Sequence, residues 1–367
     1  MFLNLVGVVA QILLIVNGEV VNKSEVVLVN VLFRHGERTP ESFYPTDPHK
    51  ENNFYPNGMG SLTNKGKRTV HRLGVFLRDE YDTLLGNFYE SSKIYARSTE
   101  SPRAQMSALL VLAGLWPPNP DQQWHPTLLW QPIPIHAKDY HDEDLLDSRA
   151  CKYSYLFKDF YLKNHTMNEK FLKPYTEMLQ YIENNSGMAV KDLISLQRFY
   201  FIVTTEHELG LPLPNWTQKV YPEPIYSAVS SIYKYFNSDL RLRQINVGYL
   251  LQKMITDFND KIKGIDVKKV MYLYSAHDTT LGYFLDAISV ITPHVPKYGS
   301  AILLELHRYD GNYFVKVRYL RSPQEPYAQD LRFPNCDVLC PFEKFVHLYA
   351  YLIPNITHKE ACARATI

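Results

Sequence analysis

The stretch VVLVNVLFRHGERTP, residues 26–40, decides the fold because an apolar run ends directly in a cluster of charged side chains. Its first eight residues are almost all apolar and rich in β-branched side chains, which is typical of a strand buried in a parallel sheet. Arg34, His35 and Arg38 follow at once. Positive charge beside a histidine favours the neutral, nucleophilic imidazole, and two guanidinium groups can bind a tetrahedral anion. The alternative interpretation is a surface loop with solvated charges.

Two further segments have the character of buried strands, KIYA at 93–96 and VMYLY at 270–274. Arg97 follows the first, and His277 and Asp278 follow the second. In open α/β sheets, ligands bind outside the carboxyl ends of the strands. Because three independent segments end in arginine, histidine or aspartate, we expect these side chains to lie together at one edge of one sheet.

Helical patterns alternate with these strands, which predicts an α/β fold with a mostly parallel central sheet flanked by helices. We expect helices over residues 62–81, 103–116 and 247–262, the first of them capped by Thr63. The segment ILLELHRYDGNYFVKVRYL, 302–320, predicts a β-hairpin that turns at its Asp-Gly pair.

Residues 150–240 interrupt this alternation with helical stretches, loops and no clear strand. We interpret them as a smaller, mostly helical cap domain. The α/β catalytic domain would then consist of residues 19–149 and 241–367.

The N-terminal run MFLNLVGVVAQILLIV predicts a secretory signal peptide over residues 1–18. The alternative is a membrane anchor, for which this run is short. No later segment is a long apolar stretch, so we expect no membrane span in the mature chain. The 367 residues carry a net charge of +1, which gives no reason to expect nucleic acid as a partner.

Cysteines and glycosylation sequons fit a secreted chain. Four cysteines predict two disulfides, with three pairings open. Cys336 and Cys340 are four residues apart and can be bridged across a turn, which leaves Cys151 with Cys362. A zinc site is the alternative, but the spacing of the four does not favour one. The candidate glycosylation sites are Asn22, Asn164, Asn184, Asn215 and Asn355.

The chemistry that these groups predict is phosphoryl transfer. A phosphate monoester needs its oxygens held and their charge matched in the transition state. His35 is the candidate nucleophile, forming a phosphohistidine, and Asp278 is the candidate proton donor to the leaving alkoxide. Guanidinium groups match the charge, so we expect neither a metal nor another cofactor. The candidate phosphate-binding residues are Arg34, Arg38, Arg97 and His277.

RHGERTP matches the RHGxRxP signature of the histidine acid phosphatases, and SAHDTT matches their HD motif. The chain resembles that family over nearly all of its mature length, most closely the prostatic and lysosomal branch and the insect secreted or venom members. The resemblance implies an α/β sheet domain with a helical cap, the residue roles given above, and the pairings Cys151–Cys362 and Cys336–Cys340. It implies a secreted acid phosphatase for small phosphomonoesters, with the lysosomal lumen as the alternative location. A homodimer is one option for its assembly.

Two other functions remain as alternatives. One is a phytase or inositol-phosphate phosphatase, which would need a more basic pocket than a net charge of +1 suggests. The other is a non-enzymatic secreted ligand-binding protein on a phosphatase scaffold, which would have no need for both a nucleophile and a proton donor.

Two features near the predicted site have two interpretations each. Arg103, six residues after Arg97, either adds to the positive field of the pocket or lies on the surface at a helix end. The run HAKDYHDED, residues 136–144, predicts a solvated loop near the rim more than a metal site, because it has no fixed ligand spacing.

Overall fold

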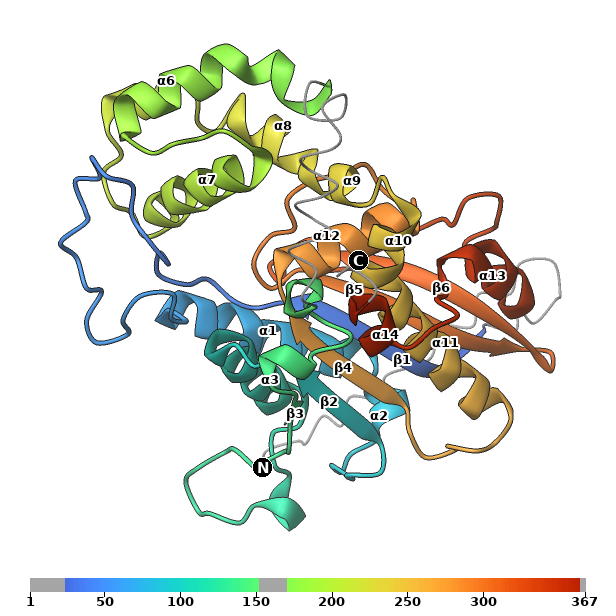
Figure 1. The fold of residues 1–367 in the computed structure, drawn as a ribbon. Coiled ribbons are helices and arrows are strands. Elements are labelled where there is room, and N and C mark those ends of the chain that lie inside the picture. Colours follow the sequence, from blue (N-terminus) through green and yellow to red (C-terminus); the bar gives the residue numbers. More distant parts are fainter. Residues whose placement is uncertain (1–23, 152–169, 364–367) are drawn as a thin grey trace, which may run out of the picture.

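A computed structural model describes residues 24–151 and 170–363, which are built around one central sheet (Figure 1). Its eight strands lie in the order β3-β2-β4-β1-β5-β6-β7, with β8 paired to β6. Four of the strands form a parallel half: β3 (His136–Ala137), β2 (Ile94–Ser98), β4 (Met271–Ala276) and β1 (Glu25–Arg34). The others pair antiparallel: β5 (Ala301–Tyr309), β6 (Asn312–Leu320), β7 (Gln329–Leu331) and β8 (Cys340–Pro341).

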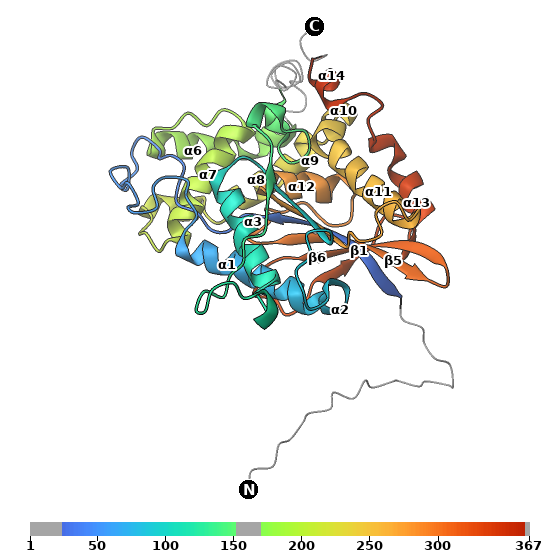
Figure 2. The same ribbon diagram turned by 90° about the horizontal axis from the view of Figure 1, so that it is seen from below.

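Helices cover both faces of the sheet, which confirms the expected α/β class (Figure 2). Alternate side chains of β1 pack into two apolar clusters, as expected for a strand buried on both faces. On one face lie α1 (Asn64–Glu80) and α3 (Pro102–Leu115), and on the other lie α11 (Tyr249–Ile262) and α12 (Asp278–Ala287). Thr63 caps α1, as expected, by accepting a hydrogen bond from the N–H of Gly66 at 3.0 Å.

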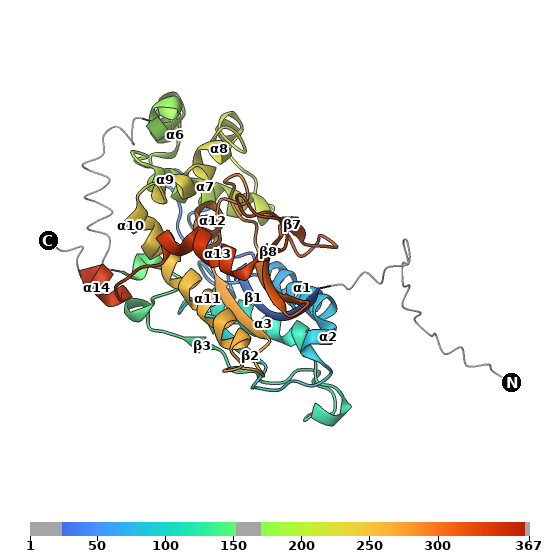
Figure 3. The ribbon, with the colours of Figure 1, turned by 90° about the vertical axis from the view of Figure 1, so that its right-hand side faces the viewer.

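Several shorter helices accompany these layers. Figure 3 shows α13 (Phe342–Tyr349) beside the antiparallel half of the sheet, where Phe342 and Phe345 join the same core as Val315 of β6. Helix α11 begins at Tyr249, directly after a wider π-helical turn over Gln244–Gly248. Further short α-helices are α2 (Asp82–Leu85), α10 (Leu240–Arg243) and α14 (His358–Ala363).

The described part of residues 150–240 is helical and holds no strand. Its core is continuous with that of the sheet, because Val203 and Val229 belong to the same apolar cluster as Leu32 of β1. The division of the chain into a cap and a catalytic domain stays a prediction. The principal helices here are α6 (Thr176–Ser186), α7 (Leu193–Glu208), α8 (Ile225–Ser230) and α9 (Ile232–Phe236).

A long loop after β1 docks on these helices. The N–H of Thr46 donates to the carbonyl of Ser186 at 3.1 Å, and the Thr46 hydroxyl donates to the carbonyl of Asn185 at 2.7 Å. Beside them, the side chains of Asp47 and Glu206 are both buried. Burial first, and then the hydrogen bond and charge of Asp47, raise the pKa of Glu206 well above its ordinary range.

This buried pair predicts that the fold is favoured by acid. A carboxyl with a raised pKa keeps its proton in the folded state while the unfolded chain has lost it. The stability that this proton confers is therefore full below about pH 4.5 and is lost as pH rises, by up to about 1.4 kcal/mol per pH unit. Glu206→Gln should remove this contribution. Between pH 5 and pH 8, the free energy of unfolding of the variant, measured in urea, should therefore rise relative to that of the wild type.

The matched control is Glu177→Gln on α6, whose side chain is exposed and should leave the pH dependence unchanged. If Glu206→Gln and the wild type lose stability in parallel over this pH range, the pair does not share a proton.

Close backbone contact fixes the loop that follows β1. A Cβ atom added at Gly36 would lie 2.3 Å from the carbonyl oxygen of Gly66, and one added at Gly66 would lie 2.1 Å from the carbonyl oxygen of Glu37. Only glycine fits at both positions, so the RHG loop rests directly on the first turn of α1.

Gly36→Ala should therefore destabilise the protein by about 2 kcal/mol or more, because the new methyl group meets backbone atoms that cannot rotate away. Chemical denaturation would measure this as a lower unfolding midpoint. A midpoint equal to that of the wild type would show that the loop and helix can separate freely.

The structure joins Cys151 to Cys362 and Cys336 to Cys340, the two pairings expected. All four sulfurs are thus used, which leaves no thiolate to bind zinc.

The structure describes only some of the residues that we expect to mark a secreted protein. Asn184, Asn215 and Asn355 are exposed, and their glycosylation stays a prediction. Asn22, Asn164 and the expected signal peptide, residues 1–18, lie outside the described residues. Within the described ranges, no helix combines the length and apolar character needed to cross a bilayer.

Candidate active site

The three strand ends meet at one edge of the sheet. In the register of β1 and β4, Arg34 lies beside Ala276, and in that of β2 and β4, Ser98 lies beside Ser275. The N–H of His35 donates to the carbonyl of Ala276 at 3.0 Å, which extends the pairing beyond the strand. The six residues singled out from the sequence are all buried, with 9% or less of each residue exposed: Arg34, His35, Arg38, Arg97, His277 and Asp278.

His35 is held in one tautomer. Its Nδ1 lies 2.8 Å from the carbonyl oxygen of Gly36, which can only accept a hydrogen bond, so Nδ1 carries the proton. Nε2 therefore keeps its lone pair, and it accepts a hydrogen bond from Nε–H of Arg103 at 3.0 Å. Burial first, and then the charges of Arg103, His277 and Arg34, hold the pKa of His35 well below its usual range. The ring is thus a neutral base with its lone pair on Nε2 even in acidic solution.

Arg34 is fixed between aromatic rings and the chain. Its guanidinium carbon lies 3.7 Å from the centre of the Tyr298 ring and 5.4 Å from that of Phe201. Nη1 donates to the carbonyl of Pro296 at 2.6 Å, and Nη2 lies 3.9 Å from Oδ1 of Asp278. These contacts hold the planar group in one orientation.

Asp278 begins helix α12, where the helix dipole stabilises negative charge. Its Oδ2 accepts a hydrogen bond from the Tyr233 hydroxyl at 3.1 Å. Burial and the charge of Asp278 raise the pKa of Tyr233 well above its usual range, so the phenol stays protonated. It therefore acts as a hydrogen-bond donor to the carboxyl group and orients it. One oxygen of Asp278 therefore remains for other contacts.

His277 lies beside His35, with 5.4 Å between the ring centres. Its Nε2 is 3.0 Å from the Thr99 hydroxyl. Burial first, and then the charge of Arg149, lower the pKa of His277 to about 3. His277 is thus a neutral hydrogen-bonding group.

Arg38 and Arg97 both contact carboxylates. Nη2 of Arg38 lies 3.3 Å from Oε2 of Glu41. Nη2 of Arg97 donates to Oε1 of Glu143 at 2.7 Å and to Oδ1 of Asp144 at 2.8 Å. The expectation of a solvated loop over residues 136–144 was wrong for Glu143, which is only 2% exposed because it binds Arg97.

Two buried guanidinium nitrogens of this site have no hydrogen-bond partner among the described residues. They are Nε of Arg34 and Nε of Arg97. An unpaired buried donor is costly, and a bound anion would remove that cost. The arrangement therefore suits an anion with several oxygens beside a neutral histidine nucleophile.

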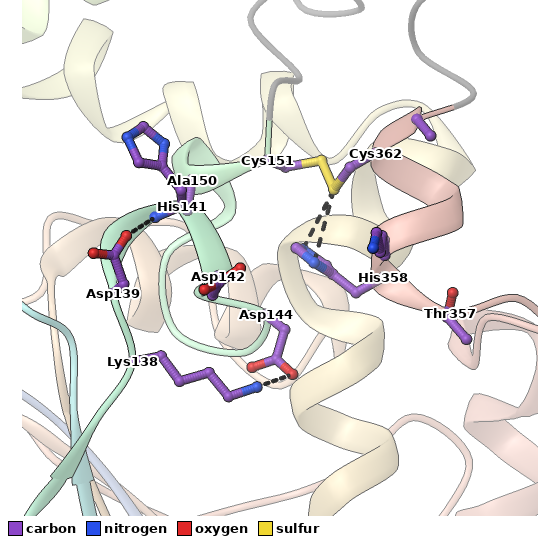
Figure 4. Close-up of a pocket in the computed structure, with 12 residues that line it drawn as sticks. Lys138, Asp139, His141, Asp142, Asp144, Ala150, Cys151, Thr357, His358 and Cys362 are labelled. Atoms are coloured by element: carbon purple, nitrogen blue, oxygen red, sulfur yellow. Dashed lines mark hydrogen bonds and ion pairs between the residues drawn. A yellow bond between two sulfur atoms is a disulfide. The ribbon is translucent and has the colours of Figure 1, made fainter.

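A cavity of 1240 Å³ is lined in part by residues of the acidic run (Figure 4). Asp144 lines it and forms an ion pair with Lys138 at 2.7 Å, so this carboxylate connects the cavity wall to Arg97. The Cys151–Cys362 disulfide lies at another part of the wall, with His358 beside it. These two cysteines and His358 are close enough to suggest a metal site, but disulfide sulfurs are not the thiolates that bind zinc.

Sequence reasoning missed several groups of the site. Tyr298 precedes β5 and Tyr233 belongs to α9, and neither has a motif that points to an arginine or an aspartate. Arg103 had two interpretations, and the structure supports the one that places it in the pocket, because it contacts His35. Its only signal in the sequence was its place six residues after Arg97, near the start of a predicted helix.

Comparisons with known proteins agree with the fold. A model of the histidine phosphatase superfamily (branch 2) matches residues 25–320. The venom acid phosphatase of Apis mellifera is 34% identical over 339 residues, covering 91% of this chain and 87% of that protein. Prostatic acid phosphatase of Homo sapiens is 33% identical, covering 90% and 86%. The solved phytase of Klebsiella sp. ASR1 superposes with a TM-score of 0.60 at 16% identity, covering 92% and 99% of the two chains, which shows a shared fold.

Proposed function

Because the chain belongs to the histidine phosphatase superfamily (branch 2), we propose that it is an acid phosphatase that hydrolyses small phosphate monoesters through a phosphohistidine. The similarity to two acid phosphatases over about nine-tenths of the chain supports phosphatase activity. The observation that carries the mechanism is the neutral His35, with its lone pair on Nε2, among buried arginines with unpaired donors.

In the first step, Nε2 of His35 attacks phosphorus, and the bond from phosphorus to the ester oxygen breaks. Asp278 gives its proton to the departing oxygen, so the alcohol leaves neutral. The arginines and His277 hold the phosphoryl oxygens and match their charge.

In the second step, water attacks the phosphohistidine. The Asp278 carboxylate takes a proton from that water, the bond from phosphorus to Nε2 breaks, and inorganic phosphate leaves. The enzyme returns to its starting protonation state. Apart from the substrate and the attacking water, this chain's own side chains supply the groups used in the two steps.

An acidic optimum follows from the two groups together. The lowered pKa of His35 keeps it nucleophilic in acid, and Asp278 can donate only while it is protonated. We expect hydrolysis of an aryl phosphate and an alkyl phosphate to be fastest below neutral pH, and to be unaffected by a metal chelator. Activity that is highest at neutral pH and disappears with chelator would contradict the proposal.

Phytate belongs in the same assay, because the alternative of an inositol-phosphate phosphatase predicts that phytate is hydrolysed best. We place the enzyme outside the cell, with the lysosomal lumen as the alternative. Two disulfides support an oxidising compartment of this kind.

A further inference from the structure

The leaving group of the proposed reaction faces helices α7 and α9. Asp278 gives its proton to the departing oxygen, so that oxygen must lie beside the Asp278 carboxyl group. This carboxyl group accepts a hydrogen bond from Tyr233 of α9 at 3.1 Å and lies 3.9 Å from Nη2 of Arg34. The guanidinium carbon of Arg34 in turn lies 5.4 Å from the centre of the Phe201 ring of α7. Whatever is attached to the departing oxygen therefore meets this side of the site.

Glu208 is the acidic residue that α7 contributes to this side. It is the last residue of the helix and lies seven positions after Phe201, which places it two turns further along the same face. Glu208 is exposed, and its carboxyl group forms no hydrogen bond or ion pair with any residue that the structure describes. Its charge interacts through space with Arg34.

Two features make this end of α7 repel anions. The last carbonyl groups of a helix carry partial negative charge, and Glu208 adds a full charge at the same end once its proton is lost. The nearest basic residue of α1, Lys65, lies 3.7 Å from Oε1 of Glu37 and is thus already paired. Bound phosphate matches the charge of Arg34, so the charge of Glu208 then acts on the leaving group.

We propose that Glu208 is a specificity-determining residue that disfavours substrates with a negatively charged leaving group. The inference rests on the proposed function and narrows its substrate class to monophosphates whose leaving group is neutral or cationic. A substrate with several phosphates, such as phytate, would bring further anions toward the end of α7. Glu208 acts on the substrate through space and takes no part in making or breaking bonds.

This discrimination should depend on pH, because Glu208 titrates. Partial desolvation by the surrounding protein, opposed by the charge of Arg34, raises the pKa of Glu208 above its ordinary value. The carboxyl group is therefore neutral in acid and becomes negative as pH rises, and the repulsion appears with that charge. The other charged or titratable groups that interact with it are Arg34, Glu37 and Arg38 at and after the end of β1, Lys65 on α1 and Tyr221 before α8.

The test compares two aryl phosphates that differ in one permanent charge, 2-naphthyl phosphate and its 6-sulfonate. A sulfonate stays ionised in acid, so only the enzyme titrates at that end of the substrate. The measured quantity is kcat/KM for the sulfonate divided by kcat/KM for the parent compound. In the wild type this ratio should fall as pH rises from about 4 to about 6.5. In Glu208→Gln the ratio should vary little with pH and should be about fivefold higher than in the wild type at the upper end.

Glu177→Gln is the matched control, because it removes the same charge from an exposed position on α6 and should leave the ratio unchanged. Glu208→Lys should raise the ratio further than Glu208→Gln does. A phenyl phosphate that carries a trimethylammonium group should respond in the opposite direction. Its kcat/KM, divided by that of phenyl phosphate, should fall about fivefold in Glu208→Gln.

A folded Glu208→Gln enzyme with wild-type ratios at every pH would overturn the inference. Equal gains for the sulfonate and its parent would also overturn it, because the carboxylate would then act on the phosphoryl group and not on the leaving group. If Glu208→Gln does not melt cooperatively, Glu208→Lys decides in its place by the same ratios. Failure of the proposed function looks different, because His35→Ala would then retain activity. Failure of this inference alone leaves His35→Ala inactive and the ratios unaltered.

Discussion

His35→Ala should lose turnover by about 10⁴-fold or more, because no other group takes the role of the nucleophile. The imidazole is neutral. Its Nδ1–H donates to the Gly36 carbonyl, so the lone pair is on Nε2. Alanine removes that lone pair and leaves the loop backbone, with its hydrogen bond to Ala276, in place. Steady-state hydrolysis of nitrophenyl phosphate measures the loss.

The matched control is His71→Ala, since His71 is exposed on α1 and is not one of the residues assigned to the site. It should retain full activity. Thermal melting should show that His35→Ala is folded. A folded His35→Ala enzyme with more than about one-tenth of wild-type kcat would exclude His35 as the nucleophile, because losing a nucleophile costs far more than tenfold.

Asp278→Asn should have an effect that depends on the leaving group. An alkoxide is a far stronger base than nitrophenolate and needs a proton as it departs. Asparagine keeps the shape and can still accept from Tyr233, but it has no acid proton to give. Alkyl phosphates should therefore lose about 10²-fold or more in rate, while nitrophenyl phosphate loses much less.

The measurement is a series of leaving groups compared under single-turnover conditions in both enzymes. Asp79→Asn, an exposed change on α1, is the control and should leave the series unaltered. On alkyl substrates the rate of the wild type should fall at high pH, and this fall should be smaller in Asp278→Asn. Equal losses across the series would mean that Asp278 positions substrate and does not donate the proton.

The parallel half of the fold could be predicted from the sequence because local patterns specify it. The run before Arg34 is buried on both faces, Thr63 accepts from Gly66, and Asp278 starts a helix directly after a strand. Parallel strands present their carboxyl ends at a common edge, so adjacent motifs converge without further information. The hairpin of β5 and β6 was predicted for the same local reason, since its turn is Asp310-Gly311.

The partners of the arginines could not be predicted, because they depend on contacts between distant segments. Glu143 approaches Arg97 across 46 residues and Tyr233 approaches Asp278 across 45. No local pattern says that an acidic run folds inward at Glu143 while its neighbour Asp142 stays exposed. The pairing of β1 with β5 is equally non-local. The antiparallel position of the hairpin beside β1 was therefore known only from the structure.

The central claim is that the phosphoryl group passes through His35. Enzyme mixed with a ³²P-labelled aryl phosphate should be denatured within one turnover at alkaline pH, where a phosphohistidine survives, and then mapped by peptide mass spectrometry, with His35→Ala run beside it. We expect label on His35 in the wild type and none in the variant. Label on any other residue, or steady turnover with no labelled protein at any time, would contradict the account.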